Sequence, residues 1–179
     1  MKVAVKVISK RQIDDVFKRN KEDFAEIELM DEVSDCSNIL TIIESFQDTE
    51  HVYIVSRYMS CGSLFDYIIK QEDSRIDEKR AQDIIHQIAT GLRNLHKRNI
   101  VHRDIKVDNI LVNISARGQP KFYVADLGSG VKLDSDEETC TFMIGTRGYV
   151  APEILRGNAY GKSVDIFSLG CLMHAILSA

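Results

Sequence analysis

The stretch Val101-His102-Arg103-Asp104-Ile105-Lys106-Val107-Asp108-Asn109-Ile110-Leu111-Val112 places two acids, two cations, a histidine and an amide between apolar residues. The apolar residues at its two ends are typical of short strands, which leaves the polar residues in a loop between them. The tripeptide His-Arg-Asp is a weak signal by itself. The full spacing, with a lysine two residues and an asparagine five residues after the aspartate, is a strong one. We therefore expect a functional loop here.

Four further motifs lie on either side of this loop. Upstream, Val3-Ala4-Val5-Lys6 belongs to a β-branched run. Downstream come Ala125-Asp126-Leu127-Gly128, then Gly145-Thr146-Arg147-Gly148-Tyr149-Val150-Ala151-Pro152-Glu153, then Asp165-Ile166-Phe167-Ser168-Leu169-Gly170. Five motifs in this order argue strongly against coincidence.

Together the motifs resemble a eukaryotic-type protein kinase of the Ser/Thr type, and the resemblance covers essentially all 179 residues. It implies an α+β, two-lobe fold, with a partial N-lobe over 1–57, a hinge near 57–62 and a partial C-lobe over 63–179. It also implies truncation at both ends. No glycine precedes Gly62, so the strands of the glycine-rich loop are missing, and the chain stops within the central C-lobe helix. We therefore expect weak activity or none from this chain alone.

The apolar pattern predicts the elements that carry these motifs. Runs of β-branched and apolar residues predict strands over 2–8, 39–43, 52–55, 110–112 and 122–124, with a polar turn over 47–51. Helical spacing predicts helices over 15–32, from the cap Ser63, after Asp77 and from Ser163. Without later helices to cover the last of these, the exposed residues are expected to be Leu169, Cys171, Leu172, Ile176 and Leu177.

The resemblance implies an ATP site at the N-terminal end of the chain. Lys6 is expected to hold the α- and β-phosphates, and a glutamate on the next helix to hold Lys6. Glu26 is the preferred glutamate, with Glu22 and Glu28 as alternatives. The adenine is expected to lie between two apolar side chains and beside the hinge, and the residues concerned are Ala4, Leu111, Ser56, Arg57 and Met59.

The resemblance also assigns the catalytic and metal-binding residues. Asp104 is expected to accept the proton of the substrate hydroxyl, and Lys106 to stabilise the transferring phosphate. Asn109 and Asp126 are expected to bind Mg²⁺, since this cation prefers oxygen ligands. His102 is interpreted as a packed core histidine rather than an acid or base.

Substrate class and regulation follow from the same resemblance. Lys106 and Thr146 resemble the residues of Ser/Thr kinases at these positions, which implies a protein substrate with a Ser or Thr hydroxyl. An activating kinase is expected to phosphorylate Thr141, or otherwise Thr139, and Arg103 to pair with that phosphate. Glu153 and Asp165 are assigned structural roles, and Asp165 is expected to anchor the catalytic-loop backbone.

Composition argues against several other classes. The chain has 23 Lys and Arg against 27 Asp and Glu, and no tail concentrates one sign, so we expect no nucleic-acid or membrane partner. The longest run without a charged residue, 166–179, is too short to span a bilayer. The cysteines form no Cys-x-x-Cys motif, which indicates reduced thiols and a cytoplasmic or nuclear protein.

Two alternatives stay open at this point. The first is a pseudokinase scaffold that binds partners with little or no catalysis; truncation favours it, and the retained Lys6, Asp104, Asn109 and Asp126 argue against it. The second is a P-loop at Gly157–Ser163. That motif is one residue short and no buried strand precedes it, which argues against a P-loop.

Overall fold

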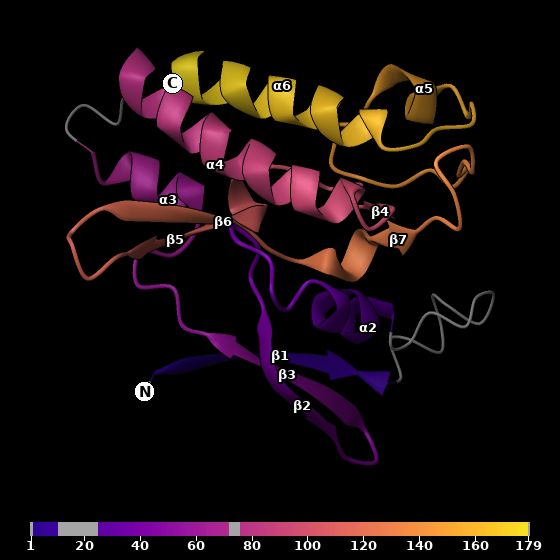
Figure 1. Ribbon diagram of the computed structural model, residues 1–179, viewed down its shortest axis with the longest axis horizontal. Coiled ribbons are helices and arrows are strands. Elements are labelled where there is room, and N and C mark those ends of the chain that lie inside the picture. The colour runs from indigo at the N-terminus through magenta and orange to yellow at the C-terminus, as the bar shows by residue number, and fades with distance from the viewer. Residues whose placement is uncertain (1, 11–24, 72–75, 179) are drawn as a thin grey trace.

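The computed structural model describes residues 2–10, 25–71 and 76–178 (Figure 1). The first part of the predicted helix over 15–32, including Glu22, therefore lies outside the described residues. No helix in the described ranges is long and apolar enough to cross a membrane.

The N-terminal part is a three-stranded antiparallel sheet with one described helix, α2, on one face (Figure 1). The strands, in the order β1-β3-β2, are β1 (Val3–Ser9), β3 (His51–Arg57) and β2 (Ile42–Gln47), and the helix is α2 (Ala25–Glu32). Ala4 pairs with Ser56 and Lys6 with Ile54. Because side chains alternate along a strand, Ala4, Lys6 and Ser56 share one face of the sheet.

The predicted boundaries of the middle two strands were wrong. Residues 44–47 continue the β2 ladder against β3, and Ile39 makes only an isolated bridge to Val124. The turn is shorter than expected because Asp48 closes it: its Oδ1 accepts the backbone N–H groups of Glu50 and His51, both at 2.7 Å. These backbone hydrogen bonds lower the pKa of Asp48 to about 2.

The C-terminal part is mainly helical, with short strand pairs beneath the helices. Its helices are α3 (Leu64–Ile69), α4 (Glu78–His96), α5 (Pro152–Leu155) and α6 (Ser163–Ser178). Its strands are β4 (Ile100–Val101), β5 (Ile110–Ile114), β6 (Pro120–Val124) and β7 (Val131–Lys132), paired β5 with β6 and β4 with β7. Two 3-10 turns, η2 (Val107–Asn109) and η3 (Leu127–Ser129), carry catalytic motifs.

The predicted helix starts are confirmed by their caps. Ser63 and Asp66 form a reciprocal capping box at α3. The side chain of Asp77 accepts the backbone N–H of Arg80 at the start of α4. Local sequence therefore suffices to place both N-termini.

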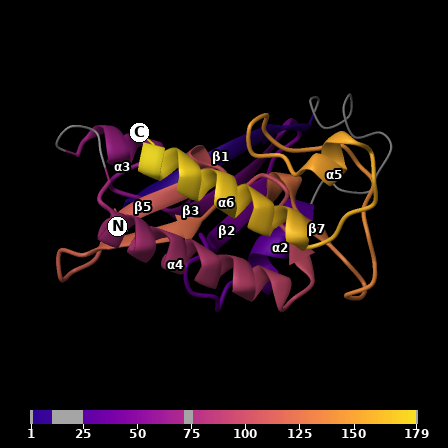
Figure 2. The same ribbon diagram turned by 90° about the horizontal axis from the view of Figure 1, so that it is seen from above.

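Helices α4 and α6 lie side by side over the core (Figures 1 and 2). Leu169, Leu172 and Ile176 of α6 are buried in the same cluster as Ile84 and Ile88 of α4. Their predicted exposure was wrong, because α4 covers this side of α6. The exposed apolar side chains of α6 are Ile166, Phe167, Met173 and Leu177.

Helix α4 also holds the segment that joins α2 to β2. The Asn38 Nδ2 donates to Gln87 Oε1 at 3.2 Å and to the Phe122 carbonyl at 2.9 Å. Gly91 permits the close approach, since a Cβ there would lie 2.5 Å from the Asn38 carbonyl oxygen and 3.0 Å from Val124 Cγ2. This contact joins the N-terminal part to the C-terminal part.

Replacing Gly91 with alanine is expected to destabilise the fold by about 1–3 kcal/mol, because the methyl group meets a backbone atom that cannot move alone. Gly170→Ala in α6 is the matched control, since a Cβ there has no heavy atom within 4 Å. Alanine in an exposed helix position is expected to stabilise by up to about 1 kcal/mol. Urea unfolding measures both variants, and equal shifts would contradict the close contact at Gly91.

Candidate active site

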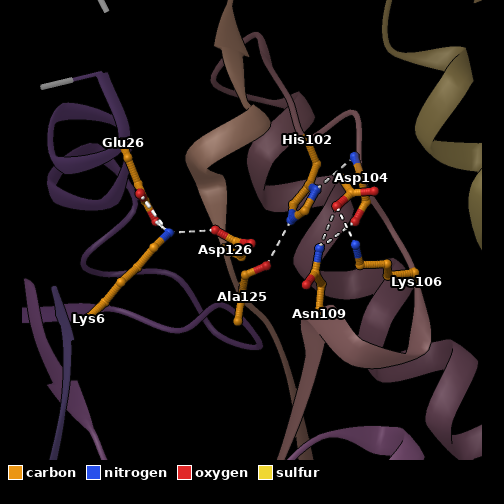
Figure 3. A network of polar contacts seen from close by, with 8 residues as sticks. All are labelled: Lys6, Glu26, His102, Asp104, Lys106, Asn109, Ala125 and Asp126. Atoms are coloured by element: carbon orange, nitrogen blue, oxygen red, sulfur yellow. Dashed lines mark hydrogen bonds and ion pairs between the residues drawn. The ribbon is translucent and has the colours of Figure 1, made fainter. Parts of the chain in front are cut away.

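Lys6 lies between two carboxylates from distant parts of the chain (Figure 3). Its Nζ donates to Glu26 Oε1 at 2.8 Å and to Asp126 Oδ1 at 2.7 Å. Strand β1 supplies the lysine, α2 supplies Glu26, and the segment between β6 and η3 supplies Asp126. The expected pair of Lys6 with a glutamate of the next helix therefore forms with Glu26. Glu28, the described alternative, makes no ion pair with Lys6.

The two carboxylates and the ammonium stabilise each other's charged forms. Burial lowers the pKa of Lys6, but the charges of Glu26 and Asp126 outweigh it and hold the pKa above its usual value. Burial raises the pKa of Asp126, but its contacts with Lys6 hold that pKa below the usual value. The Lys6 ammonium and the Asp126 carboxylate are therefore both charged at neutral pH.

The turn after β6 brings the Asp126 carboxylate to Lys6. Asp126 has a left-handed φ of 66°, an uncommon conformation for a residue with a side chain. Glycine at position 128 leaves room for the two carboxylates. A Cβ at that position would lie 3.2 Å from Asp126 Oδ1 and 3.3 Å from Glu26 Oε2.

A second polar cluster surrounds Asp104, and it lies on the loop between β4 and η2 (Figure 3). Lys106 Nζ donates to Asp104 Oδ2 at 2.8 Å, and Asn109 Nδ2 donates to the same oxygen at 3.0 Å. Thr146, forty-two positions later, donates its hydroxyl to Asp104 Oδ1 at 2.6 Å and accepts from Lys106 at 2.8 Å. The expected catalytic residues are thus brought together.

A buried carboxylate fixes the backbone of this loop. Asp165 is fully buried, and it accepts the backbone N–H of His102 at 2.9 Å and of Arg103 at 2.8 Å. The His102 ring is also buried, and its Nε2 contacts the Ala125 carbonyl at 3.0 Å. Asp165 therefore anchors the loop as the sequence implied, and His102 packs in the core.

Lys6, Glu26 and Asp126 of the first cluster and Asn109 of the second line one cavity of about 310 Å³, which is called the nucleotide cavity below. Of the expected nucleotide and metal residues, those that line it are Ala4, Lys6, Glu26, Ser56, Asn109, Leu111 and Asp126. Arg57 and Met59 do not; they line a different cavity, of about 290 Å³, because strand alternation and the turn after β3 direct them away.

Six further residues line this cavity, and the sequence did not assign them to the nucleotide site: Val5, Met30, Leu40, Ile54, Asp108 and Ala125. Ile54 reaches this lining because it pairs with Lys6 across the β1–β3 ladder. The pairing is known only from the register of the two strands in the structure.

Asn109 and Asp126 offer oxygen ligands to a divalent cation. The Asn109 amide nitrogen donates to Asp104, which leaves its carbonyl oxygen as an acceptor toward the cavity. One carboxylate and one amide oxygen beside a phosphate-sized space suit Mg²⁺, which is usually held by one or two protein oxygens together with phosphates. The donor set therefore fits the expected metal.

Comparison with known proteins agrees with this geometry. The family model described as the protein kinase domain matches residues 1–179. The chain belongs to the protein kinase domain family. Proteins of this family use ATP and a divalent metal.

Curated relatives cover nearly all of this kinase domain. A calcium/calmodulin-dependent protein kinase type 1 from Macrobrachium nipponense is 35% identical over 98% of this chain and 48% of its own length. Calcium-dependent protein kinase 4 from Plasmodium falciparum is 36% identical over 98% of this chain and 32% of its own length. The calcium/calmodulin-dependent protein kinase cmkA of Emericella nidulans is 35% identical over 98% of this chain and 41% of its own length. The chain thus spans less than half the length of these three relatives.

The kinase segment between β7 and α5 is attached to the loop before α6. Cys140 and Tyr160 exchange two backbone hydrogen bonds of 2.8 Å, and the Tyr160 hydroxyl donates to the Phe142 carbonyl at 2.6 Å. Thr139 and Thr141, on either side of Cys140, are both exposed. They are accessible to another enzyme.

Arg103 and Glu153 are two further residues to which the resemblance assigned roles. The Arg103 Nε donates to the Ser129 carbonyl at 2.5 Å and its Nη2 to the Gly130 carbonyl at 3.2 Å. Glu153 is half-buried in the first turn of α5. Arg103 therefore contacts the segment after Asp126, and neither residue lines the nucleotide cavity.

The motif Gly157–Ser163 does not form a P-loop. A helix, α5, precedes it instead of a strand, and Lys162 Nζ donates to Asn99 Oδ1 at 2.6 Å. The sequence argument against a nucleotide site here is confirmed.

The pKa of Asp104 gives a pH prediction. Burial raises this pKa, but hydrogen bonds from Lys106, Thr146 and Asn109 hold it below the usual value of about 3.9. A carboxylate with a depressed pKa stays charged as the pH falls. The stabilisation from its ion pair is therefore fully present above the pKa of the unfolded state, and it is lost as the pH falls through the lower pKa of the folded state.

The substitution Lys106→Met is expected to raise the pKa of Asp104. The fall in activity on the acid side of the pH profile should then occur at higher pH. Activity measured against pH, with Lys121→Met as the control, checks this; an unmoved limb refutes it.

Proposed function

We propose that this chain is the catalytic part of a serine/threonine protein kinase that transfers the γ-phosphoryl group of ATP to Ser or Thr hydroxyls of proteins. One observation carries the proposal. Lys6, Glu26 and Asp126 line the same cavity as Asn109, and Asn109 donates a hydrogen bond to Asp104, so the phosphate-binding and acceptor groups meet at one site.

The side chains take distinct roles in this mechanism. Lys6, held by Glu26, binds the α- and β-phosphates. Asn109 and Asp126 would hold Mg²⁺, and the cation would supply positive charge to offset that of the phosphates. A cation held there would share the Asp126 carboxylate with the Lys6 ammonium, which donates to Asp126 Oδ1 at 2.7 Å.

Asp104 acts at the hydroxyl. The substrate oxygen forms a bond to the γ-phosphorus as the bond to the β–γ bridging oxygen breaks, ADP leaves, and Asp104 accepts the hydroxyl proton. Lys106 offsets charge on the transferring group. Thr146, which contacts both Asp104 and Lys106, keeps them in place until a substrate hydroxyl enters.

Preference for Ser and Thr rests on Lys106 and Thr146. Both residues contact Asp104, so the acceptor side of the site has the arrangement that the Ser/Thr resemblance implies. The relatives described above are named calcium/calmodulin-dependent or calcium-dependent protein kinases, and the family implies a protein substrate. A cytoplasmic or nuclear setting belongs to the proposal and is tested by imaging the tagged complete protein.

The decisive experiment incubates the complete protein with labelled ATP, Mg²⁺ and a mixed protein substrate, and then identifies the phosphoamino acids. We expect phosphoserine and phosphothreonine, with no incorporation when a chelator removes the metal. Phosphotyrosine would overturn the Ser/Thr assignment. ATP binding without incorporation would favour the pseudokinase scaffold.

Phosphorylation of Thr141 by an upstream kinase is expected to raise activity about tenfold, because a phosphate there adds charge-assisted hydrogen bonds that order the segment toward Arg103. Thr141→Ala should lose this increase and Thr139→Ala should keep it. Activity before and after phosphatase treatment measures the effect. Full activity in Thr141→Ala would exclude this residue as the activating site.

A further inference from the structure

A separate cavity, of about 520 Å³, lies between the end of α4, the start of α6 and the segment around Asp136. Four basic residues line it, and we name it the basic cavity: Arg93, His96, Lys97 and Lys162. Asp136 is the one acidic residue in the lining. The cavity shares no lining residue with the nucleotide cavity.

The basic cavity already receives an anionic group from the chain itself. Lys162 donates to the Asp136 carboxylate and, at 2.6 Å, to Asn99 Oδ1. The Lys162 side chain is 24% exposed, but the Asp136 side chain is 76% exposed. An ion pair with one partner so solvated contributes little net energy, so a stronger anion can displace Asp136.

Two further cations face this cavity without a partner. Arg93 and Lys97 are separated by one helical turn, so their side chains lie on the same side of α4. Within the described residues neither side chain has a hydrogen bond or an ion pair. Two unpaired cations beside Lys162 repel each other, and a doubly charged anion between them relieves that repulsion.

We propose that the basic cavity binds a phosphate group in place of Asp136. The Arg93 guanidinium offers a planar fork to two phosphate oxygens, and Lys97 and Lys162 offer ammonium donors. The Asn99 amide N–H groups add donors, because Lys162 uses only its oxygen. These contacts suit inorganic phosphate and the phosphate of a monoester equally.

His96 connects the basic cavity to the catalytic loop by a chain of contacts. The His96 Nε2 contacts Asp165 Oδ2 at 2.8 Å, and the same Asp165 oxygen accepts the His102 backbone N–H at 2.9 Å. The other Asp165 oxygen accepts the Arg103 N–H. The His96 ring therefore lies two contacts from the backbone that carries Asp104, and a phosphate beside that ring lies three contacts from it.

Calorimetric titration of the complete protein tests the site, with inorganic phosphate and phosphoserine as probes, at constant ionic strength and without divalent metal. We expect saturable binding that becomes about tenfold weaker in Arg93→Gln/Lys97→Gln, since two charge-assisted hydrogen bonds are lost. Asp136→Asn is expected to tighten binding, because it removes the competing carboxylate. Lys79→Gln/Lys121→Gln removes the same charge elsewhere and should bind as the unaltered protein does.

The outcomes separate the possibilities. Equal binding by the two double variants, or no saturable binding, overturns the site. Binding of phosphate alone identifies the free ion as the ligand, and binding of both probes identifies the phosphate group. Selective labelling of histidine and arginine backbone amides tests the link by NMR: the His102 and Arg103 signals should shift with phosphate, and binding without that shift overturns the link. Neither readout depends on the proposed kinase activity.

Discussion

Replacing Asp104 with asparagine is expected to lower phosphoryl transfer by about a thousandfold, the usual contribution of a positioned general base. Asparagine has almost the same shape, so Lys106 and Thr146 keep a neighbour of the right size. It cannot take the proton of the substrate hydroxyl. The loss should therefore appear in kcat, with little change in the KM for ATP, because Asp104 does not line the nucleotide cavity.

Steady-state phosphorylation of a peptide with a single serine measures this effect. Asp31→Asn on α2 is the matched control, since Asp31 is exposed and lies outside the nucleotide cavity. The control should retain full activity. A loss below tenfold in Asp104→Asn would exclude Asp104 as the base, and an equal loss in the control would point to a general effect of charge.

Replacing Asp165 with alanine is expected to destabilise the protein by about 2–5 kcal/mol, because each buried N–H without an acceptor costs about 1–3 kcal/mol. The change leaves the His102 and Arg103 N–H groups without their acceptor and removes the contact of His96. A typical domain has only about 5–15 kcal/mol of net stability, so the effect is large. The catalytic loop should also lose its position.

Urea unfolding with circular dichroism measures the change in unfolding free energy. Asp165→Asn keeps one carbonyl oxygen and should lose less than alanine does. Asp136→Asn removes an exposed carboxylate and should stay close to the unaltered stability. If Asp165→Ala lost as little unfolding free energy as Asp136→Asn, the Asp165 contacts would not be important for the stability of the fold.

The sequence alone predicted most of the chemistry, because the catalytic side chains lie in short motifs. The spacing of Asp104, Lys106 and Asn109 puts them on one loop, and the capping signals of Ser63 and Asp77 are local. The sequence preferred Glu26 but left Glu28 open, and the contact of Glu26 with Lys6 in the tertiary structure decides between these two residues of the same short helix.

The sequence could not show which side of α6 is buried. This helix is apolar nearly all round, so its pattern has no clear polar face, and the expected exposure of Leu172 and Ile176 was wrong. The position of Arg57 and Met59 outside the nucleotide cavity was equally hidden, because it depends on the strand register and the turn after β3.

The sequence by itself determined the family resemblance, the helix starts and the identity of the reactive groups. These properties depend on residue type and on neighbours within a few positions. Only the tertiary structure decided which groups meet: Lys6 with Asp126, Thr146 with Asp104, and His96 with Asp165. The partners in these pairs are 120, 42 and 69 positions apart. At such separations a contact depends on how whole elements pack, which no local pattern encodes.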